Sequence, residues 1–216
     1  MDTGQILDKI LIIPAILLAF TFHEYAHAMT ADRLGDKTPK FQGRLTLNPI
    51  SHIDPIGFIM ILVFGFGWAK PVQTNPSAFK NYYKDDLKVS LAGPLANIAL
   101  AFVFSIILGV YSKFGLQSSQ LGSIIYIIIY YTAYFNCMLF FLNLIPIPGF
   151  DGFHILRDLF PKAFYKVSDS IYRYEFLLFM LLILPILPGG SSVFSYIVGV
   201  PSNLLFSFFR SLAGMI

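Results

Sequence analysis

Charged residues are scarce in this sequence: Asp, Glu, Lys and Arg make up 12% of its 216 residues, whereas hydrophobic residues make up 56%. The charges stand in blocks between apolar runs, which is not how they are distributed on the surface of a soluble protein. The formal net charge is only +3, and the Lys and Arg residues are dispersed among loops, which argues against a nucleic-acid-binding surface. The composition therefore predicts an integral membrane protein whose surroundings are the lipid bilayer, with no nucleic-acid partner.

Cysteine is nearly absent as well, since Cys137 is the only one and lies inside an apolar run. No internal disulfide can form, and this thiol is not expected to be a metal ligand. The N-terminus also lacks a basic leader with a small-residue cleavage site, so we expect its apolar stretch to be retained as a helix. Aromatic residues, by contrast, make up 17% of the chain, which suits lipid-facing and interfacial positions.

Three apolar runs are long enough to cross the hydrocarbon core of a membrane, which takes about 20 residues. They cover residues 10–29, 89–110 and 124–144. The second and third contain no charged residue, whereas the first is interrupted by His23, Glu24 and His27. Ionisable groups at membrane depth are functional candidates by default. We therefore expect an all-α polytopic membrane protein that forms a single membrane-embedded domain over residues 1–216.

The segment 56–69 is apolar but short and rich in glycine, so it either crosses the membrane or enters and returns on the same side. Lys and Arg are clustered in residues 31–52, 70–88 and 157–173. If 56–69 is re-entrant, all three clusters lie on one face and the isolated Lys9 and Lys113 lie on the other, as the positive-inside rule expects. We predict a re-entrant loop, a cytoplasmic basic face and an extracytoplasmic N-terminus.

The region after residue 173 has a weaker pattern. Residues 176–187 form a short apolar run that ends in Pro and Gly, and residues 193–209 are apolar but interrupted by Pro201. We expect one or two accessory helices at about 175–210, following a core that covers residues 10–155.

The residues His23-Glu24-Tyr25-Ala26-His27 form an HExxH pattern inside the first apolar run. A spacing of four places both imidazoles on one face of a helix, one turn apart, where two nitrogens can meet one ion. Glu24 projects beside that face and can take a proton from the attacking water without being a ligand itself. Such a pattern arises by chance in soluble sequences, but inside a membrane these three groups are costly unless a cation compensates them. The pattern therefore predicts a zinc site.

A catalytic zinc ion has three protein ligands and one open position, so a third ligand must come from another part of the chain. Asp151 is the candidate, because it follows the third long run in a stretch where prolines and glycines break the helix. The re-entrant path also brings Asp151 to the same face of the membrane as the histidines. The competing ligands are His154, Asp54 and His52, of which His52 is the best substitute or a fourth ligand.

Five motifs follow one another over residues 20–155: HEYAHA, GRLTLNPISHIDPIG, WAKPV, SLAGPLAN and NLIPIPGFDG. Together they resemble the site-2 protease family of intramembrane metalloproteases, specifically its compact bacterial and archaeal branch without PDZ or nucleotide-sensing domains. The resemblance implies a three-helix catalytic core in a prokaryotic cell membrane, with zinc on His23, His27 and Asp151. It also places Asn143 beside the active site, where it could steady an oxyanion or the substrate backbone. Asn97 is a weaker candidate, and for both a helix–helix hydrogen bond is the structural alternative.

The resulting hypothesis is hydrolysis of a peptide bond in or near a transmembrane helix of a membrane-protein substrate, with Glu24 as the base. Such a helix must unwind before cleavage, and residues 43–48 of a short β-hairpin could offer it a strand edge. A membrane metal-binding or transport protein with the same ligands is the main alternative. A transport protein would not need Glu24 and would require polar groups across the full depth of the membrane. An inactive scaffold is a third hypothesis, against which the complete set of His, Glu, His and Asp argues.

Overall fold

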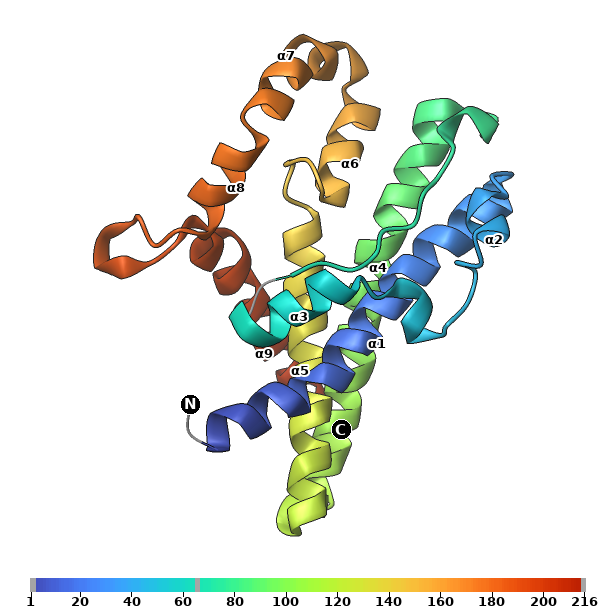
Figure 1. The fold of residues 1–216 in the computed structure, drawn as a ribbon. Helices are drawn as coiled ribbons and strands as arrows, with labels where there is room; N and C mark the ends of the chain where they lie inside the picture. The colour runs from blue at the N-terminus through green and yellow to red at the C-terminus, as the bar shows by residue number, and fades with distance from the viewer. Residues whose placement is uncertain (1–2, 65–66, 215–216) are drawn as a thin grey trace.

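The computed structural model describes residues 3–64 and 67–214, and these residues are mostly helical (Figure 1). The three long helices are α1 (Thr3–Leu34), α4 (Tyr82–Lys113) and α5 (Gln120–Asn143). Among the described residues, only these three helices are long and apolar enough to cross a membrane. In α1 the apolar part is Ile10–Leu34. The predicted all-α polytopic fold and its three spans are therefore confirmed. Helix α4 begins before residue 89 because the polar turns at 82–88 extend the helix beyond the apolar run.

The remaining elements are short. They are α2 (Thr38–Phe41), η1 (Pro49–His52), α3 (Pro55–Phe64), η2 (Pro76–Ala78), η3 (Leu116–Ser118), α6 (Asp151–Leu159), α7 (Pro161–Arg173), α8 (Glu175–Ile183), η4 (Pro188–Gly190), η5 (Ser195–Gly199) and α9 (Val200–Ala213). Helices α2, α6 and α7 lie at the end of the core where α4 begins, whereas the turn between α4 and α5 lies at the opposite end (Figure 1). Many of the clustered Lys and Arg residues thus gather at one end of the molecule.

The three long helices pack through small residues, which allow close approach of helices where apolar side chains alone provide no driving force. The alanines of α1 that are fully buried are Ala15, Ala19, Ala28 and Ala31. An asparagine pair crosses the centre of the core: the side-chain amide of Asn97 donates to Oδ1 of Asn136 at 2.8 Å and to the Ala19 carbonyl at 3.3 Å. These contacts join all three helices at one level.

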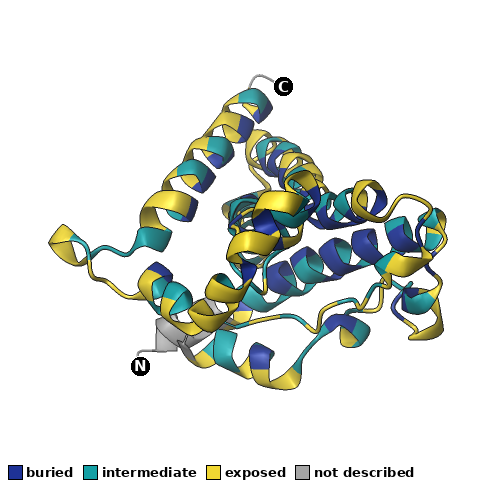
Figure 2. Ribbon diagram, turned by 90° about the horizontal axis from the view of Figure 1, so that it is seen from above, coloured by how far each residue is buried: buried dark blue, intermediate teal, exposed yellow. Residues whose placement is uncertain are grey.

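Burial follows the facing sides of the helices, and their outward sides are exposed (Figure 2). Large apolar side chains are prominent among the exposed residues, including Leu95 and Phe102 on α4 and Leu121 on α5. A surface of this kind is costly in water but is expected where lipid tails cover it. The exposed apolar surface agrees with the membrane location inferred from composition.

The segment around α3 folds back on itself, as the predicted re-entrant loop requires, while its entry into the membrane stays a prediction. Helix α3 has ten residues and is therefore only about 15 Å long, half of a hydrocarbon core. Ile53 and Ala69 form an antiparallel bridge, and the amide of Lys70 donates to the carbonyl of His52 at 2.9 Å. A Cβ atom on Gly67 would lie 2.0 Å from the Gly57 carbonyl oxygen, so glycine is required where the two arms of the loop touch.

The predicted β-hairpin was wrong. Among the described residues the only β pairings are two isolated bridges, one of which closes the re-entrant segment, and residues 43–48 form no strand. The side chain of Asn48 accepts from the Ile50 amide and starts η1 at once. Pro49 and Pro71 also lack the amide hydrogen that a continued ladder would need.

One or two accessory helices were predicted in the C-terminal region, and it contains two, α8 and α9, joined by a loop and the π-helical turn η5. Helix α9 is an integral part of the bundle, because Phe206 and Phe209 are buried in one apolar cluster with residues of α4 and α5. The short helix α8 packs through Leu182 against Ile145 and Val198.

Candidate metal and catalytic site

His23 and His27 lie one turn apart on α1, and both are buried. Their Nε2 atoms are 3.0 Å apart. The HExxH spacing thus produces the pair of facing imidazoles that helix geometry predicts.

Asp151 is the first residue of α6 and reaches the histidines from the far end of α5. Its Oδ2 lies 3.2 Å from Nε2 of His23, and its Oδ1 lies 3.3 Å from Nε2 of His27. The chain can bend back here because Gly149 has a φ of 95°, which glycine adopts without strain. Gly152 is needed as well, since a Cβ atom there would lie 2.3 Å from the Leu144 carbonyl oxygen.

The three side chains fit a zinc ion. His23, His27 and Asp151 each offer a ligand atom, and these atoms lie within 4.8 Å of one another. Ligands bound at about 2.0–2.1 Å to a tetrahedral ion are about 3.3 Å apart, close to the separations observed. Oδ2 of Asp151 is also buried without a hydrogen-bond partner. A buried carboxylate oxygen in this position is stabilised by a cation.

The outer nitrogens of both imidazoles are held by helix α4. Nδ1 of His23 donates to Oδ1 of Asn97 at 2.7 Å, and Nδ1 of His27 donates to the Val89 carbonyl at 2.7 Å. These bonds place the proton of each ring on Nδ1 and leave the Nε2 lone pairs facing each other, which is the form that binds metal. Two bare nitrogens at 3.0 Å would repel unless a cation lay between them.

From the sequence, Asn143 was the stronger candidate for a role in the active site and Asn97 the weaker one. The structure places Asn97 in direct contact with a histidine, while the Asn143 amide donates to the Leu139 carbonyl at 3.0 Å and its side chain lines the cavity beside the site. Asn143 remains a candidate for contacting substrate. Asn97 also forms the helix–helix hydrogen bonds that were expected as its structural role, so one side chain both joins the helices and contacts His23.

Substituting leucine for Asn97 should weaken zinc binding by roughly 10–100-fold, because outer-shell partners of metal-binding histidines have effects of this size. The measurement is a zinc titration of purified protein against a competing chelator. Asn203→Leu, at an exposed position of α9, is the matched control. Equal zinc affinity of the two variants would contradict the orienting role of Asn97.

Gly93 was not singled out by its chemistry, although it lies in the SLAGPLAN motif. A Cβ atom at this position would lie 2.3 Å from Nε2 of His27 and 2.5 Å from Cε1 of His23. Helix α4 therefore approaches the imidazoles as closely as it does only because residue 93 has no side chain.

Replacing Gly93 by alanine should displace both imidazoles and remove most of the bound zinc. Gly199→Ala is the control, because a Cβ atom there would meet nothing closer than 4.0 Å. Metal content per protein, measured by mass spectrometry of the elements, distinguishes the variants. Normal zinc content in Gly93→Ala would show that the site tolerates a methyl group that the geometry excludes.

Glu24 is also buried, next to the histidines. Its Oε2 accepts a hydrogen bond from the Val72 amide at 2.8 Å. The segment that carries Val72 is held in turn by the buried guanidinium of Arg44, which donates to the carbonyls of Ser51, Lys70 and Pro71. Sequence reasoning found neither contact, because both depend on how the re-entrant loop folds back.

An open cavity of about 580 Å³ adjoins the three candidate metal ligands and Glu24. Val72, Thr74, Tyr82 and Asn143 line it, whereas residues 43–48 do not. The proposed substrate-pairing edge at 43–48 is therefore not at this cavity. The part of the re-entrant region that faces the site is the extended segment after Pro71.

The wall of the cavity formed by α4 and α6 is charged. Arg157 of α6 pairs with Asp86 of α4 and, through Nε at 2.8 Å, with Asp158. Burial raises the pKa of the Asp158 carboxyl to about 6, against the effect of the Arg157 cation. Desolvation by the surrounding protein and the same cation lower the pKa of His154, although part of its side chain is exposed. These pairs attach α6, and with it Asp151, to the beginning of α4.

The competing ligands do not reach the metal cluster. Nε2 of the buried His52 donates to the Thr46 carbonyl at 2.8 Å, and Oδ1 of Asp54 accepts from the Gly57 amide at 2.8 Å. His154 lines the cavity but is not in the cluster with His23 and Asp151. His52 and Asp54 thus organise the re-entrant loop.

A helical membrane protein in which an HExxH helix and a distant aspartate can together hold one ion is typical of membrane-bound zinc metalloproteases. The chain is a member of Peptidase family M50, whose model matches residues 11–187. YwhC of Bacillus subtilis, whose name describes a zinc metalloprotease, is 40% identical over 187 residues, covering 84% of this chain and 83% of the relative. A relative from Methanocaldococcus jannaschii with the same description is 32% identical over 158 residues, covering 71% of this chain and 72% of that protein. No solved structure matches the chain.

Proposed function

We propose that this zinc metalloprotease cleaves peptide bonds in or next to transmembrane helices of membrane-protein substrates. The observation that supports this most directly is the position of the metal cluster on a membrane-spanning helix. His23 lies 13 residues into the span that begins at Ile10, which corresponds to about 20 Å along the helix. The ligands are thus within reach of a bond at membrane depth.

The proposed orientation follows from the charge distribution. Placing the Lys and Arg clusters in the cytoplasm puts the start of α1 outside and the cavity with Asp151 nearer the cytoplasmic face. The cavity of about 580 Å³ has charged and polar walls, so it can admit water to the site from that face.

In the proposed reaction, His23, His27 and Asp151 would hold zinc, which would polarise the carbonyl as a Lewis acid and lower the pKa of water. Glu24 takes the proton of the attacking water and then delivers it to the leaving amine. The Val72 amide fixes Oε2 of Glu24 and leaves the second carboxylate oxygen available for this proton. Asn143 lines the same cavity and is proposed to donate to the substrate backbone.

The test is cleavage of a reporter transmembrane helix by purified protein in lipid nanodiscs, with and without a zinc chelator. We expect cleavage within the reporter's membrane segment that stops on chelation and returns with added zinc. Cleavage confined to soluble peptides would contradict the proposed substrate class. Zinc flux into proteoliposomes without cleavage would instead support the transport alternative.

A further inference from the structure

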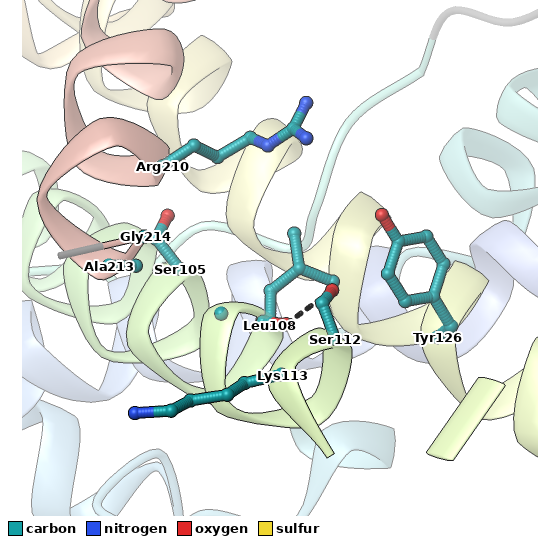
Figure 3. Close-up of a pocket in the computed structure, with 9 residues that line it drawn as sticks. Ser105, Leu108, Ser112, Lys113, Tyr126, Arg210, Ala213 and Gly214 are labelled. Atoms are coloured by element: carbon teal, nitrogen blue, oxygen red, sulfur yellow. Dashed lines mark hydrogen bonds between the residues drawn. The ribbon is translucent and has the colours of Figure 1, made fainter. Parts of the chain in front are cut away.

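A second polar cavity, of about 550 Å³, lies between helices α4, α5 and α9, at the opposite end of α4 from the segment that lines the metal site. Its lining includes Ser105, Ser112 and Lys113 of α4, Tyr126 of α5 and Arg210 of α9. In Figure 3 the guanidinium of Arg210 and the hydroxyls of Ser105 and Tyr126 are seen around the cavity, while Lys113 extends along α4 away from Arg210. None of the lining residues is acidic.

Arg210 is an exposed residue of α9, and it lies beside the apolar part of α4 and not beyond its end. The rings of Phe102 and Phe209 are 5.3 Å apart, and a Cβ atom on Gly109 would lie 2.8 Å from the Cβ of Ala213. Helix α9 therefore runs parallel to α4 and places Arg210 level with residues 102–109 of that span. Its guanidinium lies 5.7 Å from the ring of Phe206, one turn further into the bundle.

A guanidinium level with an apolar span is stabilised either by water at the interface, which a long side chain can reach, or by an anionic partner. Among residues 3–64 and 67–214, Arg210 forms no ion pair with a carboxylate. The hydroxyl of Ser105 is also fully buried and has no hydrogen-bond partner. An unpaired guanidinium and an unpartnered buried hydroxyl in one cavity are both satisfied by an oxygen-rich anion.

We propose that this cavity binds the phosphate of an anionic phospholipid, with Arg210 as the main contact and the Ser105 hydroxyl as a donor to the same headgroup region. The guanidinium fork matches the geometry of phosphate oxygens. A lipid is favoured over free phosphate because the cavity lies between the spans α4 and α5 and helix α9, and exposed apolar side chains such as Phe102 and Phe208 offer a surface to acyl chains.

The test is native mass spectrometry of the full-length protein released from nanodiscs that contain phosphatidylglycerol and phosphatidylcholine. We expect the unmodified protein to retain phosphatidylglycerol, and Arg210→Gln to retain roughly tenfold less, since loss of a charged fork costs more than a neutral hydrogen bond. Ser105→Ala should lose about half of the retained lipid, consistent with one weaker donor. Arg173→Gln, at an exposed position of α7, should match the unmodified protein.

Equal retention by Arg210→Gln and the unmodified protein would overturn the proposal, as would equal retention of the two lipids. Complete displacement by millimolar inorganic phosphate would overturn the lipid assignment. Zinc content and thermal unfolding report whether Arg210→Gln is folded. If it is not, Arg210→Lys serves instead, because it keeps the charge but loses the fork and should retain less lipid. Lipid retention is measured without any cleavage reaction, so the result does not depend on the proposed proteolysis.

Discussion

Protein with glutamine at position 24 is expected to keep its zinc and to cut no reporter helix. Glu24 is the carboxylate beside the metal ligands, and glutamine preserves its shape and the bond from the Val72 amide but cannot accept the proton of water. Loss of a general base of this kind lowers the rate by about 10²–10⁴-fold or more. The measurement pairs reporter cleavage in nanodiscs with zinc content per protein.

Glu175→Gln is the matched control for this experiment. Glu175 is the other glutamate of the chain and lies exposed on α8, so its variant should cleave normally. Residual turnover in Glu24→Gln at the rate of the unmodified enzyme would show that another group is the base. Loss of zinc from Glu24→Gln would show that Glu24 holds the metal, contrary to the role proposed for it.

Replacement of Asp151 by asparagine should strip most of the zinc and abolish cleavage with it. The change removes the negative charge of the ligand set and leaves a neutral amide beside the two imidazoles, 3.2 and 3.3 Å from their Nε2 atoms. We expect zinc binding weaker by on the order of 100-fold, because affinity depends on ligand charge and donor type. A zinc titration against a competing chelator measures the change.

Asp169→Asn, at an exposed position of α7, controls for the loss of one carboxylate. Unchanged zinc affinity in Asp151→Asn would remove Asp151 from the ligand set. A His52→Ala variant would then be measured next, since His52 was the best substitute at the level of sequence. The bond from His52 to the Thr46 carbonyl predicts instead that His52→Ala keeps its zinc.

The spans and the metal-binding residue types were predictable because each depends on local pattern and on the cost of charge in lipid. An uncharged run of some 20 residues has one stable arrangement in a membrane. Two histidines four residues apart on such a helix must face the same way. The folding back of the segment around α3 was predictable for a related reason, since only a re-entrant path collects the Lys and Arg clusters on one face. The membrane topology itself stays a prediction.

The hairpin failed because it depended on pairing between particular strands. Residues 43–48 have an alternating pattern, but the Asn48 cap and the prolines around them favour turns. The hydrogen bonds of Arg44 could not be predicted from the sequence for the same reason. Its three acceptors lie 7, 26 and 27 residues away, and nothing in the local sequence indicates which carbonyls it meets.

By itself, the sequence determined that the surroundings of the protein are lipid and where its three spans lie. It also determined which helix carries His23 and His27 and which aspartate is available to join them. Only the tertiary structure decided that Asn97 and the Val89 carbonyl orient the imidazoles and that Gly93 makes room for them. It alone showed that Arg210 and Ser105 share a cavity. The reason is physical: hydrophobicity and helical period act within one segment, whereas hydrogen-bond partners and close approaches depend on how separate helices pack together.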